Sequence, residues 1–143
     1  MADYVFIKAT RDDLATLMKL RLATMDSHLK AAGLTLSEQQ HEARVLEDGD
    51  CTFLIMQAGI NLGAIKYKCN NDNVTILQLQ IFPQFQNAGH GTAVLHCVFR
   101  EAGNRPVALT VLKANPALHL YERSGFTIVG EDKYEYHMER KQD

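Results

Sequence analysis

Two spacings of hydrophobic residues alternate along the chain, and each indicates one kind of secondary structure. Apolar residues three or four apart form one face of a helix, and the first such run contains Leu14, Leu17, Met18, Leu22 and Met25. Ser37 followed by Gln40 has the spacing of a capping box, which marks the start of a helix. We expect four helices, at residues 10–25, 37–46, 91–102 and 116–124.

Short apolar runs bounded by turn residues predict seven strands, at residues 4–8, 51–57, 61–69, 74–82, 107–112, 126–130 and 134–138. Tight turns at 58–59 and 70–73 indicate that the three middle strands form an antiparallel meander. The strand–helix–strand unit that follows implies a parallel pair of strands. The order is therefore β-α-α-β-β-β-α-β-α-β-β. The fold class is α/β, an α+β arrangement with a mixed, mostly antiparallel sheet and one locally parallel pair.

Composition narrows the class of protein. A chain of 143 residues has the length of one domain, so we expect a single domain spanning 1–143. It is 46% hydrophobic and 22% charged, which is typical of a globular protein. The net charge of −2 provides no bulk attraction for a polyanion, so we expect no nucleic-acid partner. Because no apolar run reaches membrane-spanning length and the three cysteines have no paired spacing, we expect a cytoplasmic protein without membrane contact.

A glycine-containing loop at residues 86–92 is the most informative segment for function. It reads Gln-Asn-Ala-Gly-His-Gly-Thr and lies between an expected strand and an expected helix. Glycines let the backbone approach a ligand closely, and the unpaired amides and dipole at a helix start attract phosphate. The loop lacks the lysine of a Walker A motif and the third small residue of a dinucleotide-binding fingerprint. By itself it also fits a plain turn or a nucleotide-binding regulatory domain.

A second segment, at residues 115–126, reads Asn-Pro-Ala-Leu-His-Leu-Tyr-Glu-Arg-Ser-Gly-Phe. With both segments in order, the chain resembles the GNAT superfamily of acyl-CoA-dependent N-acetyltransferases. The family's loop pattern, Gln/Arg-x-x-Gly-x-Gly/Ala, is matched from Gln86 to Gly91. The family's second motif is matched at all defined positions but one, since its alanine falls one place early, at Ala117. The matching residues are Asn115, Leu120, Tyr121, Gly125 and Phe126. The resemblance covers nearly the whole chain.

The resemblance implies a GNAT-like fold in which the parallel pair of strands splays apart and acetyl-CoA is the acetyl donor. Ile81 and Phe82, at the end of the splayed strand, would offer backbone groups to the pantetheine arm. Asn115 matches a residue that bonds the pantetheine, and Tyr121 one that lies beside the cofactor sulfur. The pyrophosphate would be held by the backbone amides of Gln86, Asn87, Ala88, Gly89, His90, Gly91 and Thr92. We expect no metal, because the sequence has no metal-ligand spacing. Self-association is common in this fold, so a homodimer is compatible with it.

Amine acetylation needs a proton donor for the leaving thiolate. A phenol keeps its proton at neutral pH, so Tyr121 is the expected general acid. The reaction also needs a group that removes a proton from the amine. Several family members carry a glutamate at the position of Thr75, but the strand here has no carboxylate. Gln78 and Gln80 on that strand can orient water or substrate but cannot accept a proton.

Two residues of the last expected strand are further candidates for the base. Glu135 and His137 are expected near the acceptor, on opposite faces of the strand, so that at most one of them faces the site; His137 has the better pKa for the task. The acceptor-binding residues are therefore expected to be Gln78, Gln80 and His137.

The resemblance predicts an N-acetyltransferase that moves an acetyl group from acetyl-CoA to a primary amine, directly, within a ternary complex. The missing strand carboxylate motivates an alternative, a catalytically weak acyl-CoA-binding sensor or interaction module. An acidic stretch that includes Glu38, Glu42, Glu47, Asp48 and Asp50 would suit a cationic amine, and a solvated helix face explains it equally well. The acceptor stays open among small molecules, lysine side chains and peptide N-termini.

Overall fold

The computed structural model describes residues 3–142, and the elements follow the expected order. The strands are β1 (Tyr4–Lys8), β2 (Thr52–Gln57), β3 (Ile60–Cys69), β4 (Val74–Ile81), β5 (Val107–Leu112), β6 (Thr127–Glu131) and β7 (Glu135–Arg140). The helices are α1 (Leu14–Ala31), α2 (Glu38–Leu46), α3 (His90–Ala102) and α4 (Ala117–Arg123). Short 3₁₀ turns cover Arg11–Asp13, Gly49–Cys51 and Pro83–Phe85. Among residues 3–142, no helix is both long enough and apolar enough to cross a membrane.

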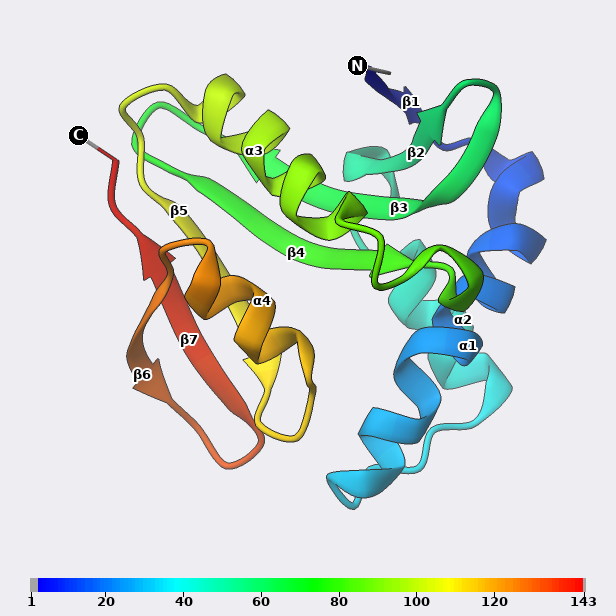
Figure 1. Ribbon diagram of the computed structural model, residues 1–143. Coiled ribbons are helices and arrows are strands. Elements are labelled where there is room, and N and C mark those ends of the chain that lie inside the picture. Colours follow the sequence, from blue (N-terminus) through cyan, green and yellow to red (C-terminus); the bar gives the residue numbers. More distant parts are fainter. Residues whose placement is uncertain (1–2, 143) are drawn as a thin grey trace.

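The strands form one seven-stranded sheet in the order β1-β2-β3-β4-β5-β7-β6. Every neighbouring pair is antiparallel except β4 and β5, which are parallel. This arrangement confirms the predicted mixed sheet with its meander and its single parallel pair. Helix α3 connects the two parallel strands and lies across the sheet, as Figure 1 shows.

Two hydrophobic clusters lie on opposite faces of the sheet. Ala64 and Ile65 are neighbours on β3 but belong to different clusters, as the alternation of side chains along a strand requires. The larger cluster packs α3 and α4 against one face. The smaller cluster packs α1 and α2 against the other face through Leu17, Leu20 and Val45. The sheet is therefore the middle layer of the molecule.

The parallel pairing of β4 with β5 is short. It ends at the pair Ile76 and Leu109, although β4 continues for five more residues to Ile81. At the same point the register between β3 and β4 shifts between Lys66 and Tyr67, which leaves Leu77 as an extra residue in β4. A bulge of this kind bends the strand that contains it. The bulge thus marks the place where β4 turns away from β5.

Helix α1 is longer than the sequence pattern predicts. We expect an end near residue 25, but the helix continues to Ala31. Leu29 lies one turn beyond Met25 on the same face and is buried, so packing on the apolar stripe continues past the predicted end. The predicted capping box of α2 is confirmed, because Ser37 Oγ accepts from Gln40 N–H and Gln40 Oε1 accepts from Ser37 N–H.

We predict that Gly63→Ala lowers the free energy of unfolding by about 2–3 kcal/mol, the size of an overpacking penalty. A Cβ atom at residue 63 would lie 2.0 Å from the carbonyl oxygen of Gln80, because β3 and β4 approach closely there. Urea unfolding measures the change. Gly49→Ala is the matched control, since a Cβ there meets nothing within 4 Å, and its stability should change by less than about 0.5 kcal/mol. Equal stability of the two variants would contradict the close approach.

Candidate functional site

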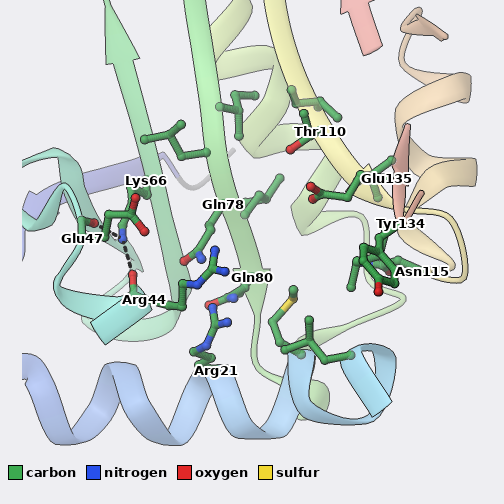
Figure 2. Close-up of a pocket in the computed structure, with 18 of the residues that line it drawn as sticks. Arg21, Arg44, Glu47, Lys66, Gln78, Gln80, Thr110, Asn115, Tyr134 and Glu135 are labelled. Carbon is green, nitrogen blue, oxygen red and sulfur yellow. Dashed lines mark hydrogen bonds between the residues drawn. The ribbon is translucent and has the colours of Figure 1, made fainter. Parts of the chain in front are cut away.

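A pocket of about 490 Å³ opens where β4 and β5 separate. Residues of both strands line it, from Ile76 to Gln80 on β4 and from Leu109 to Leu112 on β5. Helices α1 and α2 border one side, and Asn115, Tyr134 and Glu135 border the other, as Figure 2 shows. The splay of the two strands therefore creates a cavity in the middle of the sheet.

The unpaired end of β4 directs backbone groups toward this gap. The N–H of Phe82 donates to the carbonyl oxygen of Leu62 on β3 at 2.9 Å. Successive residues of a strand point their backbone groups to alternate sides, so the N–H of Ile81 faces away from β3 and toward the gap. The carbonyl oxygen of Ile81 accepts a 2.9 Å hydrogen bond from Gln86 Nε2. Of the two residues expected to offer backbone groups, Ile81 presents its N–H to the gap, whereas the N–H of Phe82 is bonded within the sheet.

The glycine loop leads directly into α3, as the sequence predicts. Gly89 is the N-cap of the helix and has a φ of +85°, a left-handed conformation that side-chain-bearing residues adopt only with strain. Asn87 is also left-handed, at a φ of +63°. The first-turn N–H groups of α3 have no carbonyl partner within the helix and carry the positive end of its dipole. Gly91 lets α3 approach α4, because a Cβ there would lie 2.9 Å from Leu120 Cδ2.

Several side chains of the glycine loop are bonded elsewhere or exposed. His90 Nδ1 is 2.7 Å from the hydroxyl of Tyr4 on β1, so this ring is engaged away from the pocket. Ala88 and Thr92 are exposed. The loop therefore offers a ligand its backbone amides, which matches the chemistry expected of a pyrophosphate site.

Tyr121 lies on α4 and lines the pocket from the α3–α4 face of the sheet. It is 6% exposed, and its ring packs edge-to-face on Phe126 at 5.8 Å between centroids. Burial raises the pKa of Tyr121 to about 12, because the charged phenolate would lose its hydration. Asn115 also lines the pocket, and its Oδ1 accepts a 2.9 Å hydrogen bond from Ala117 N–H at the start of α4. Both expected residues therefore lie at one cavity.

The residues predicted for the acceptor side do not all line the pocket. Gln78 and Gln80 line the pocket, as does Glu135. His137 is outside the pocket lining, and its Nε2 is 3.2 Å from Asp132 Oδ2. Glu135 and His137 are two residues apart, so they lie on the same face of β7 and the expectation of opposite faces is wrong. They differ in their position along the strand. The carboxylate that sequence reasoning ranked second is the one that borders the cavity.

Three basic residues line the pocket that sequence reasoning did not identify: Arg21 on α1, Arg44 on α2 and Lys66 on β3. Arg21 is 4% exposed and Lys66 is 5% exposed. The sequence does contain a signal for Arg21, which falls on the apolar stripe of its helix between Leu17 and Met25. Charged residues are rarely buried unless they have a partner. Burial, followed by repulsion from Arg44, lowers the pKa of Arg21.

Lys66 has a structural role that satisfies its buried ammonium group. Its Nζ donates to the carbonyl oxygens of Arg44 at 3.0 Å, Val45 at 3.2 Å and Glu47, at the end of α2. These carbonyls have no partners within the helix, so Lys66 caps α2 and ties it to the sheet. Burial lowers the pKa of Lys66, against the opposing effect of the nearby Asp48 and Glu47 carboxylates. Within residues 3–142, no group of three or more His, Cys, Asp or Glu side chains is placed to hold a metal ion.

Comparison with known proteins identifies one family. The profile of the acetyltransferase (GNAT) domain matches residues 23–139. An acetyltransferase from Thermus thermophilus is 17% identical, with a TM-score of 0.77 and 96% of each chain covered. The PaiA N-acetyltransferase from Thermoplasma acidophilum, solved in complex with coenzyme A, is 18% identical, with a TM-score of 0.72, covering 97% of this chain and 99% of that one.

A third solved structure comes from Arabidopsis thaliana and holds the bisubstrate analogue CoA-Ac-MVNAL. It is 17% identical, with a TM-score of 0.65, and covers 96% of this chain and 98% of that one. A search of curated proteins found no match. At these identities the structural likeness shows that the fold is shared.

We predict that Tyr121 stays protonated at pH 10, where an unperturbed tyrosine is half ionised. A raised pKa of about 12 means that the phenol loses its proton only well above pH 10. Wild type and Tyr121→Phe should therefore show the same ultraviolet tyrosinate absorbance at pH 10, with circular dichroism as the control for folding. A lower absorbance in the variant at pH 10 would show that Tyr121 ionises like an ordinary tyrosine.

Proposed function

The chain belongs to the GNAT family of acetyltransferases, and on that premise we propose that it transfers an acetyl group from acetyl-CoA to a primary amine within a ternary complex. The observation that carries the proposal is the cavity between the splayed strands β4 and β5. Tyr121, Asn115, Gln78, Gln80 and Glu135 all line it. The cavity thus has room for two substrates between groups able to move protons at both of them.

The proposed donor site combines the gap with the start of α3. The backbone amides from Gln86 to Thr92 would hold the pyrophosphate, favoured by the helix dipole and by the left-handed Gly89. The N–H of Ile81 and the side chain of Asn115 would bond the pantetheine arm. Acetyl-CoA brings a thioester carbon that is activated toward attack by an amine.

Side chains of the protein then accept and donate the protons of the reaction. As the amine nitrogen bonds to the acetyl carbon, its proton passes to Glu135, directly or through a water oriented by Gln78. As the carbon–sulfur bond breaks, the hydroxyl of Tyr121 gives its proton to the sulfur. Because burial raises the pKa of Tyr121, the phenol holds its proton until the sulfur develops negative charge.

The catalytically weak acyl-CoA sensor was motivated by the absence of a carboxylate on β4. Glu135 weakens that motive, because a carboxylate from β7 borders the same cavity. Both functions predict binding of acetyl-CoA, but only the enzyme predicts turnover. Measuring binding and turnover together therefore distinguishes the two functions.

We predict saturable binding of acetyl-CoA in a calorimetric titration, without binding of ATP. Gly89→Val should abolish it, because a side chain at a φ of +85° strains the loop that holds the phosphates. Gly103→Val is the matched control, since Gly103 ends the same helix with a φ of +63° and a Cβ there meets nothing within 4 Å. Similar stability of the two variants, with binding lost only in Gly89→Val, supports the loop assignment. Unchanged affinity in Gly89→Val contradicts it.

We predict that Tyr121→Phe lowers kcat by about 10²-fold or more, the usual effect of losing a general acid, and leaves the Kd of acetyl-CoA nearly unchanged. Glu135→Gln should lower kcat similarly, and His137→Gln should have little effect because His137 lies outside the pocket lining. Release of CoA thiol during amine acetylation measures all three variants. A rate in Tyr121→Phe equal to the wild-type rate would remove Tyr121 from the chemistry.

A further inference from the structure

Arg21 is held in place by a series of polar contacts that runs from the buried His41 to the surface. Its Nε–H donates to His41 Nδ1 at 3.0 Å, and His41 Nε2 lies 3.3 Å from Asp26 Oδ1. Asp26 in turn pairs with Lys30 at 3.0 Å. Because Arg21 Nε–H donates to Nδ1, the ring proton of His41 is on Nε2 and points to Asp26. His41 is 2% exposed, so its hydrogen bond to Arg21 fixes the direction of the guanidinium from inside the α1–α2 layer.

The far end of the same guanidinium has no protein partner. Within residues 3–142, Arg21 Nη1 is buried and makes no hydrogen bond. Figure 2 shows the group directed into the pocket, beside Arg44 and Gln80. A buried cationic donor without an acceptor costs free energy, so its retention calls for an explanation. The donor would be satisfied by a negatively charged or strongly polar acceptor in the pocket.

Two other unpartnered buried atoms have a simpler explanation. Thr52 Oγ1 and Gln80 Nε2 both lack hydrogen bonds within the described residues, and both side chains line a separate cavity of about 20 Å³. That cavity is large enough for one water molecule, which can bond to both atoms. Arg21 lines the main pocket and not this cavity, so a water there leaves its Nη1 without a partner among residues 3–142.

The charges around the pocket are arranged in two groups. At the α1–α2 end, Asp48 pairs with Lys68 at 2.8 Å, and the Glu47 carboxylate lies near the ammonium of Lys66. Arg44, exposed on α2, adds a second positive charge at the same end. Glu135 is a carboxylate at the other end, beside Asn115 in Figure 2. The α1–α2 end therefore combines basic groups with carboxylates, and the pocket is not the uniformly acidic one that a polycation would need.

We propose that the amine acceptor also carries a carboxylate, which bonds to Arg21 Nη1 beside Arg44 while its amine lies toward Glu135. The substrate class is a small amino acid. This deepens the proposed function and rests on it. A guanidinium matches a carboxylate in geometry and charge, and the hydrogen bond is strong because both groups are ionised. A cavity of about 490 Å³ suits a small acceptor together with the acetyl end of the donor.

The test compares acceptors that differ only in the carboxylate. L-amino acids and the corresponding amino amides are assayed as pairs by release of CoA thiol, with a polyamine and a short peptide included. We expect at least one acid to exceed its amide in kcat/KM by about tenfold or more, the size expected of a hydrogen bond to a charged group. The amides have the more readily deprotonated amine, so intrinsic reactivity biases the comparison against this result.

Variants test whether Arg21 causes the preference for acids over amides. Arg21→Gln should remove it by lowering kcat/KM for the acid about tenfold or more, with little change for the amide and an unchanged Kd for acetyl-CoA. Arg21→Lys should restore part of it by returning the charge without the planar fork. Arg11→Gln, the same substitution at an exposed arginine, is the control and should behave as wild type. Thermal unfolding confirms that the variants fold, and the comparison of acid with amide in the wild type needs no variant.

A binding measurement keeps this inference separate from the proposed function. With ¹⁵N-arginine labelling, the Nε–H signal of Arg21 is assigned by its loss in Arg21→Gln, and the same acids and amides are titrated in the presence of CoA. A shift with acids and not with amides supports the carboxylate site, whether or not acetylation follows. Equal shifts, no shift, or acetylation that favours the amides, the polyamine or the peptide overturns it. Absence of acetyl-CoA binding overturns the proposed function instead.

Discussion

The separation of β4 from β5 is the constraint on which the rest of the structure depends. Three residue pairs hold the two strands together, and the bulge at Leu77 then turns β4 away. A parallel pair within a sheet would ordinarily leave no space between its strands, because their backbone groups bond to each other. Here the unpaired backbone of β4 and the side chains of both strands surround a cavity. The active-site proposal, the position of Tyr121 and the direction of the Ile81 amide all follow from that one break in the ladder.

Two sets of elements close the cavity from opposite faces, and they use different interactions. The α3–α4 side is held by apolar packing, and Gly91 is the position at which these two helices come close. The α1–α2 side has a smaller apolar cluster and adds buried polar bonds. Lys66 reaches from β3 to the last carbonyls of α2, and Arg21 reaches from α1 to His41 on α2. Breaking one partner of such a buried polar link is costly, so these bonds give α2 a defined position.

The difference between the two faces matches a division of labour in the proposed reaction. The proposed donor site consists mainly of backbone groups, which suit an invariant ligand such as acetyl-CoA. The proposed acceptor side consists of side chains from α1, α2, β4 and β7, which differ in charge. Proteins of one fold can therefore share a donor and act on unrelated amines, since selectivity resides in residues that the fold does not require.

Local patterns in the sequence determined the elements and their order. The capping box of Ser37 and Gln40, the turns at 58–59 and 70–73, and the glycine loop depend on neighbours within a few residues, so the local sequence is enough to indicate them. The motifs that carry Gly89, Asn115 and Tyr121 are local in the same sense. The end of α1 was missed because the burial of Leu29 depends on packing between elements. The acceptor side depends on the same kind of contact over longer distances.

Arg21 and His41 are 20 residues apart, and Arg21 and Glu135 belong to opposite ends of the chain. No spacing in the sequence connects them. The acidic residues near 38–50 suggested a pocket for a cation, whereas folding turns Arg21 inward, places Arg44 beside it and pairs Asp48 with Lys68. The sequence by itself thus determined the fold family and the place of the glycine loop between β4 and α3. Only the tertiary structure decided the charge of the acceptor pocket and which carboxylate borders it, because charge at a site is a sum over residues that folding brings together.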